Sequence, residues 1–253
     1  MKRINQYIVE KLKISKPTKV NINHTLFPSN RKELVQIIKK EIEEKGNKCS
    51  LNHIDVSSVT NMNSLFSDSQ FNGDISEWDV SNVIDMGLMF QNSNFNKDIS
   101  NWDVSNVKSM NCMFRGSNFN RDISEWEVSN VEDMSFMFKN SKFNGDISEW
   151  DVSSVKTMSD MFNNSKFNGD ISEWDVSNVE YMISMFSYSN FNKDISKWNV
   201  SNVKYMNEMF EASHFNRDIS EWKISSNCNV YNMFKDCKIK DVYKPYKNGN
   251  RIE

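Results

Sequence analysis

The stretch FNGDISEWDVSNV, residues 71 to 83, decides the fold because nearly the same words return every 24 residues. Each copy opens with a phenylalanine, and these are Phe71, Phe95, Phe119, Phe143, Phe167, Phe191 and Phe215. A chain of 253 residues could hold one or two ordinary domains, but a short internal period is typical of an array of small units. We therefore predict a repeat protein.

One 24-residue unit, which we call a coil, shows the pattern in full: FNKDISNWDVSNVKSMNCMFRGSN, residues 95–118. Four of its apolar residues fall at i, i+3, i+6 and i+7, which predicts a two-turn helix or 3₁₀ segment; they are Val107, Met110, Met113 and Phe114. Ser105 or Asn106 stands just ahead as an N-cap. The DIS step around Ile99 predicts a short strand.

A single coil is too small to fold alone. Burying its eight apolar side chains contributes roughly 12–24 kcal/mol, whereas ordering its backbone and side chains costs roughly 36 kcal/mol. Stacking adds hydrogen bonds between parallel strands and seals each apolar layer between its neighbours. The predicted fold class is therefore a solenoid, with one short parallel β-strand and one short helical turn per coil, and a helical cap at the N-terminal end.

Two kinds of column run through the array. All seven tryptophans share one column, Trp78, Trp102, Trp126, Trp150, Trp174, Trp198 and Trp222, and we predict a core ladder rather than a ligand site. The aspartates Asp74, Asp98, Asp122, Asp146, Asp170, Asp194 and Asp218 form a structural polar ladder. Stacked carboxylates repel unless main-chain N–H groups or hydroxyls bind them, or cations such as calcium lie between them. We favour local hydrogen bonding and predict no metal and no cofactor.

The recurrent FNxDISxWDVSNVxxMxxMFxxSx resembles the BspA-like leucine-rich repeat surface proteins, in the form common in mycoplasma lipoproteins, over about residues 51–238. The resemblance implies a right-handed, leucine-rich-repeat-like solenoid at the cell surface that binds a protein or a host-matrix component. Phe, Trp and Met here occupy places where ordinary leucine-rich repeats use Leu. The secretion or lipoprotein signal of surface members is missing from this sequence, so cytoplasm or virion is the default location.

The sequence divides into four parts. Residues 1–28 predict an amphipathic helix and a linker; the helix either docks on the cap or serves as a handle for another protein or for self-association. Residues 29–50 predict a capping helix from about Arg31 to Lys45, with Asn30 as its N-cap and Gly46 at its end. Residues 51–238 hold about seven to eight coils. Residues 239–253 form a tail that either covers the last apolar layer with Tyr243 and Tyr246 or is loose.

Composition and motifs favour a non-catalytic protein. Residues 1–50 carry 12 Lys/Arg and 5 Asp/Glu, so one end is basic and the remainder acidic. Basic residues alternate with apolar ones there in helical fashion, and no recognition motif accompanies them, so no nucleic acid is expected. The four cysteines show no regular spacing, no apolar stretch reaches the ~20 residues of a membrane span, and no catalytic motif occurs. We predict that the protein is not an enzyme.

The coils differ most at positions inferred to face outward on the helical side. A protein-binding surface is predicted there, because exposed aromatic residues suit protein interfaces; its residues are Leu88, Phe136, Tyr181, Ile183, Tyr188 and Tyr205. Scattered apolar residues on a surface are also normal and need no function. We predict a binding module, adhesin-like or a scaffold, whose partner is another protein or a host-matrix component. The alternative is a structural component of an assembly such as a phage particle or a cell-envelope layer.

Overall fold

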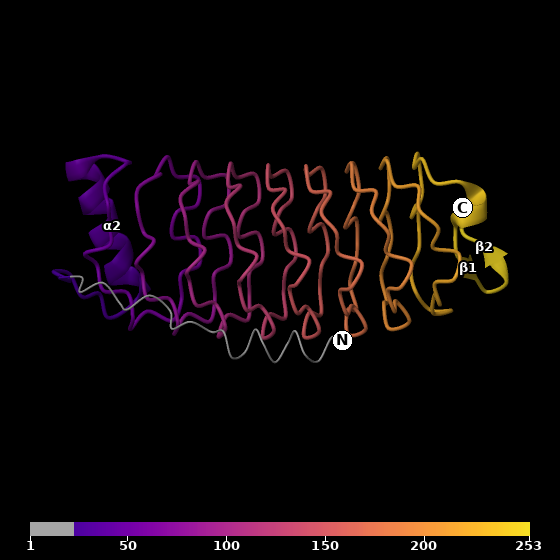
Figure 1. Cartoon of the computed structure of the whole chain (residues 1–253), viewed down its shortest axis with the longest axis horizontal. Helices are drawn as coiled ribbons and strands as arrows, with labels where there is room; N and C mark the ends of the chain where they lie inside the picture. The colour runs from indigo at the N-terminus through magenta and orange to yellow at the C-terminus, as the bar shows by residue number, and fades with distance from the viewer. Residues whose placement is uncertain (1–22) are drawn as a thin grey trace, which may run out of the picture.

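The computed structural model describes residues 23–253. The helix predicted for the first 14 residues lies outside this part of the chain. The elements are helix α2 (Arg31–Lys45), the 3₁₀ helix η1 (Asp241–Tyr243) and the antiparallel strands β1 (Tyr246–Lys247) and β2 (Asn250–Arg251). Between α2 and η1 the coils lie side by side along the long axis of the molecule, with α2 at one end and the two strands at the other (Figure 1).

Helix α2 begins and ends where its capping residues predict. The Asn30 side chain accepts a hydrogen bond from the Glu33 N–H at 3.1 Å, and the Gly46 N–H donates to the Ile42 carbonyl. Its buried residues Leu34 and Ile38 join the core of the first coil. The helix therefore covers the apolar layer that the first coil would otherwise expose.

The chain reaches the first coil earlier than the predicted linker allows. Leu26 forms a parallel bridge with Ile54, and the Asp55 N–H donates to the Leu26 carbonyl at 2.9 Å. Residues before α2 thus add one more main-chain pairing ahead of the repeats.

The strand predicted around Ile99 is not present. The Asp98 carboxylate accepts a hydrogen bond from the Ser100 N–H at 2.9 Å, and the Trp102 N–H donates to the Ile99 carbonyl at 3.1 Å. These two bonds close a turn, because an aspartate that binds the N–H two residues later favours a turn over an extended strand. The DIS step is therefore a corner of the coil.

The predicted two-turn helix over Val107–Phe114 is also absent, and consecutive turns take its place. The N–H groups of Met113 and Arg115 donate to carbonyls three residues earlier, while those of Cys112 and Phe114 donate to carbonyls of the next coil at 2.8 and 3.0 Å. An α-helix would need all of them within one coil. We call this array of alternating bonds the turn ladder.

Parallel pairing between coils occurs as isolated bridges at the start of each turn segment. They link residues 24 apart, and the column consists of Asn61, Asp85, Ser109, Asp133, Thr157, Tyr181, Tyr205 and Asn229. The apolar pattern thus predicted which residues stack on one another, but the pairing lies in a different column from the one expected.

The core is a set of aromatic and thioether columns. The seven tryptophans are 3 or 4% exposed, and each indole N–H donates to a main-chain carbonyl 27 residues earlier, as Trp150 does to Ile123 at 3.1 Å. Phenylalanine rings stack both within a coil and between coils, with centroids of Phe138 4.3 Å from Phe143 and 5.8 Å from Phe162. Every coil therefore contacts both neighbours through its core.

The C-terminal tail closes the other end with aliphatic residues. Ile239 and Ile252 are each 7% exposed, and Tyr243 packs partly buried against the core. Tyr246 is 49% exposed and lies against the Arg251 guanidinium instead. Of the two tyrosines considered for this role, only Tyr243 contributes to the cover.

Candidate binding surface

All six residues of the predicted binding surface lie on the turn ladder. We define the turn face as the outward side of residues 61–68 and of the segments that follow it every 24 residues, the last being 229–236. Hydrogen bonds join each segment to the next. Because the coils are tied at four alternate N–H groups, side chains on this face keep fixed positions relative to one another.

The clearest aromatic feature of the turn face is a pair of stacked tyrosines. The rings of Tyr181 and Tyr205 have centroids 5.5 Å apart and an interplanar angle of 6°, and the residues are 37% and 41% exposed. Both are bridge residues, so the main chain fixes their separation. Tyr188, which is 59% exposed, follows on the same turn segment as Tyr181. Half-buried Ile183 lies between them in sequence.

The other two predicted residues lie in other coils and are more enclosed. Leu88 and Phe136 are both half-buried. The cations of Arg115 and Lys139 lie 5.9 and 5.4 Å from the Phe136 ring centroid, and Lys139 also pairs with Asp160 at 2.7 Å. Charged groups therefore cover much of Phe136, and the predicted set divides into an exposed tyrosine group and two separate residues.

The prediction missed Tyr231, which is 68% exposed on the last turn segment. It occupies the column of Ile183, two coils further along. The signal was present in the sequence as an aromatic residue at an outward position, but the last coil departs from the repeat pattern and obscured it.

Charge alternates along the column just before the bridge residues: Lys108, Glu132, Lys156, Glu180 and Lys204. Lys204 and Glu180 pair at 2.6 Å, and this hydrogen bond lowers the pKa of Glu180. Pairs as exposed as this contribute little stability. Their effect is to flank the tyrosines with both signs of charge.

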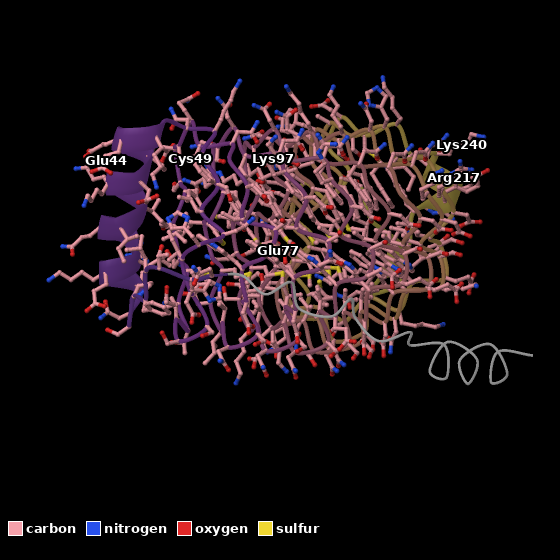
Figure 2. All side chains as sticks on the ribbon, turned by 60° about the vertical axis from the view of Figure 1, so that its left-hand side comes forward. Glu44, Cys49, Glu77, Lys97, Arg217 and Lys240 are labelled. Carbon is pink, nitrogen blue, oxygen red and sulfur yellow. The ribbon has the colours of Figure 1, made fainter. Side chains whose placement is uncertain are left out.

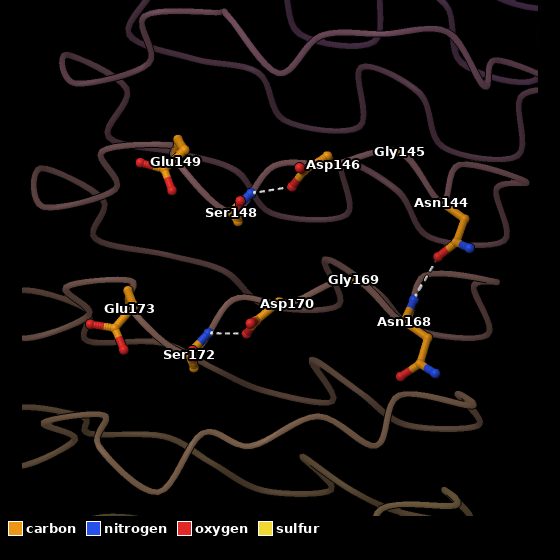
Figure 3. A pocket seen from close by; sticks show the side chains of 10 residues that line it. All are labelled: Asn144, Gly145, Asp146, Ser148, Glu149, Asn168, Gly169, Asp170, Ser172 and Glu173. Carbon is orange, nitrogen blue, oxygen red and sulfur yellow. Dashed lines mark hydrogen bonds between the residues drawn. The ribbon is translucent and has the colours of Figure 1, made fainter. Parts of the chain in front are cut away.

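The side of the coils that carries the aspartate ladder offers a second surface. Figure 2 shows nitrogen and oxygen atoms at side-chain tips around the whole stack, with Lys97 and Arg217 labelled. These two belong to a column that reads Gly73, Lys97, Arg121, Gly145, Gly169, Lys193 and Arg217. Two adjacent glycines leave a shallow hollow of about 430 Å³ beside Asp146, Glu149, Asp170 and Glu173 (Figure 3).

Hydrogen bonds within each coil hold the aspartate ladder, as predicted. The Asp146 and Asp170 carboxylates accept from the N–H groups of Ser148 and Ser172 at 3.0 Å, and the Asn168 N–H donates to the Asn144 side chain at 2.8 Å (Figure 3). The same aspartate–serine bond recurs at Asp74, Asp98, Asp122, Asp194 and Asp218. The bond from Ser148 lowers the pKa of Asp146, although the neighbouring Asp122 opposes it.

A buried group of ionisable side chains lies under α2. Glu41 is 8% exposed and lies 2.6 Å from the Lys45 Nζ and 3.0 Å from the His53 Nε2. Within residues 23–253, no three His, Cys, Asp or Glu side chains are arranged to hold a metal ion. The Glu41 group joins the cap to the first coil, so its role is structural.

A family model described as "Mycoplasma protein of unknown function, DUF285" matches the chain twice, over residues 35–145 and 133–244. No curated protein and no solved structure matches the chain. In the described part of the chain, no helix has both the length and the apolar character needed to cross a membrane.

Proposed function

Because the chain belongs to a Mycoplasma protein family of unknown function, DUF285, we propose its role from its own surface: a non-catalytic module that binds another protein. The partner is a protein of the host matrix or of the cell that makes the chain. The turn face of the coils from residue 181 to residue 212 is the binding surface.

The stacked pair of Tyr181 and Tyr205 is the observation that carries this proposal. Tyrosine supplies a large contact area with few rotatable bonds, and the two rings lose little further freedom because they already pack on each other. Tyr188, whose backbone has φ 56°, extends the aromatic area on the same face. Lys204 and Glu180 give this area a charged rim, which is the anatomy of a protein interface.

We further propose that the stack is a right-handed, leucine-rich-repeat-like solenoid of the BspA-like kind. Parallel bridges between residues 24 apart support it. A solenoid suits binding because its repeats form one extended surface. By the same resemblance, the module acts at the cell surface as an adhesin-like protein or a scaffold.

Affinity capture with matched variants tests the binding surface. The native chain is immobilised beside Tyr181→Ser/Tyr188→Ser/Tyr205→Ser, and both are exposed to solubilised host-matrix and cell proteins. Phe27→Ser/Val242→Ser is the control, since it removes two side chains that are 67% and 64% exposed away from the turn face. Each variant is first shown to melt as the native chain does.

The expected result is a partner that the native and control chains retain and that the tyrosine variant retains at least about tenfold less, as hot-spot tyrosines do. Equal retention by all three chains contradicts the proposed surface. Retention of no protein by the native chain contradicts the proposed function.

A further inference from the structure

The turn ladder has an open edge at its C-terminal end. In the coil before the last, the N–H groups of Met206, Glu208, Phe210 and Ala212 donate to carbonyls of the last coil at 2.7 to 2.9 Å. The equivalent N–H groups of the last coil belong to Val230, Asn232, Phe234 and Asp236. Within residues 23–253, none of these four donates to an acceptor.

The C-terminal tail covers the core at this end but not the ladder. Lys247 donates to the Cys228 carbonyl at 2.6 Å, which replaces the bond that a further coil would supply, as Lys108 N–H supplies it to the Ile84 carbonyl. Ile252 covers the apolar layer. Strands β1 and β2 lie at one part of this end in Figure 1. A hollow of about 550 Å³ lies between them and the last turn segment.

The hollow joins the open edge to basic and apolar side chains. Val230 and Asn232 line it from the ladder, and Lys235, Lys247 and Arg251 line it with positive charge, against the single carboxylate side chain of Glu253. Tyr231, which also lines it, is 68% exposed. Unpaired N–H groups at alternate residues form a ready template for another chain.

We propose that this open edge binds an extended acidic segment of a partner protein, which continues the turn ladder. The donors stand at i, i+2, i+4 and i+6, and an extended peptide presents carbonyls on one side with that period. Lys235, Lys247 and Arg251 select aspartate or glutamate at the outward positions. The site is separate from the tyrosines of the turn face at residues 181–205.

A second copy of the chain is a poorer occupant than a peptide. Two C-terminal ends would place N–H donors opposite N–H donors. The acceptor edge of the first coil lies under α2, where Leu34 and Ile38 are buried and Arg31 Nε already donates to the Asn63 carbonyl at 2.7 Å. Head-to-tail stacking would therefore require α2 to leave the core.

Amide hydrogen exchange of the full chain, followed by NMR, tests the proposal. The probe is acetyl-Glu-Val-Glu-Val-Glu-Val-Glu-amide, and the control probe has Lys in place of each Glu. In the free protein, amides 230, 232, 234 and 236 are expected to exchange at least about tenfold faster than amides 206, 208, 210 and 212. The acidic probe at millimolar concentration slows the first four about tenfold, and the control probe does not.

Two variants separate charge from the fold. Lys235→Glu is expected to weaken acidic-probe binding at least about fivefold, because it reverses a charge beside the edge. Lys166→Glu, at an exposed position where the ladder is paired, leaves binding unchanged. The turn-face variant Tyr181→Ser/Tyr188→Ser/Tyr205→Ser also binds the probe as the native chain does, so the two proposals can fail separately.

Three results overturn the proposal. They are absence of slowing with the acidic probe, slow exchange of the four amides in the dilute free chain, and slowing that follows protein concentration without any probe. The last result identifies a second copy as the occupant.

Discussion

At the scale of single residues, the turn ladder depends on a backbone conformation that most residues avoid. Each coil places two residues at positive φ, the third and the seventh of its turn segment after the bridge residue, as Phe136 and Asn140 show with 60° and 58°. A turn whose third residue has positive φ is a type II turn. Asn, Asp and Gly dominate the second of these two columns, whereas the first admits Leu, Phe, Cys and Glu.

The sequence could therefore have predicted only half of this feature. Asn92, Gly116 and Asn140 are residues that tolerate positive φ. Leu88 and Phe136 do not suggest it, because the bonds to the next coil impose the conformation on them. Local residue preferences contain no record of those bonds.

Ala212 tests the importance of this conformation, since its φ is 50° and its side chain makes no hydrogen bond. Ala212→Val is expected to lower the free energy of unfolding by about 1–2 kcal/mol, because a β-branched residue fits the left-handed region poorly. Ala212→Gly should match or exceed the native chain, since glycine adopts positive φ without steric cost. Urea unfolding measures both, and equal destabilisation by the two substitutions would contradict this account.

At the scale of elements, the N-terminal cap was predictable and the inner structure of the coils was not. Helix α2 follows from Asn30, Glu33 and Gly46, whose capping bonds are local. The corner at Asp98–Trp102 was mistaken for a strand because a stacked column suggested strand pairing. The local signal there, an aspartate two residues before a serine, in fact indicates a turn.

The contact between α2 and the first coil should make the cap sensitive to acid. Burial raises the pKa of Glu41, but the hydrogen bond from Lys45 and the charges of His53 and Lys45 outweigh it, and the net pKa is lowered. A carboxyl with a lowered folded-state pKa stabilises the fold above its unfolded pKa of about 4.3, and this contribution is lost as the pH falls through the folded value.

Glu41→Gln is therefore expected to reduce stability at pH 7 and to lose less of it as the pH falls from about 5 to about 3. The difference in free energy of unfolding between the native chain and the variant, measured across this range, should shrink toward acid. The aspartate ladder is common to both chains and largely cancels. A difference that is constant with pH would mean that the Glu41 charge does not hold the cap.

At the scale of the whole molecule, stability comes from repetition. Trp150 donates its indole N–H to Ile123 of the preceding coil, and Phe138 stacks on Phe162 of the following one, so each coil completes its neighbours. The sequence predicted this interdependence because the columns of apolar residues are strict. It did not predict the partners of the tryptophan N–H groups, which are main-chain atoms.

Deletion of one whole coil should be tolerated, and deletion of half a coil should not. Removing residues 143–166 joins Lys142 to Phe167 and keeps every column in register. This chain is expected to unfold in one transition, at a moderately lower temperature because one interface is lost. Removing residues 143–154 puts Val155 where a phenylalanine belongs and should abolish the single transition. Calorimetry distinguishes the two, and like behaviour of both deletions would refute strict stacking.

The direction of the ladder bonds has an electrical consequence. From Met62 to Ala212, the N–H groups that join coils all point toward the C-terminal end, and the carbonyls that receive them point back. Their peptide dipoles add instead of cancelling, as they do along a helix. The two ends of the molecule are therefore poles of opposite sign, positive beside Asp236 and negative beside Asn61, so the stack has a polarity that its nearly balanced net charge of −3 conceals.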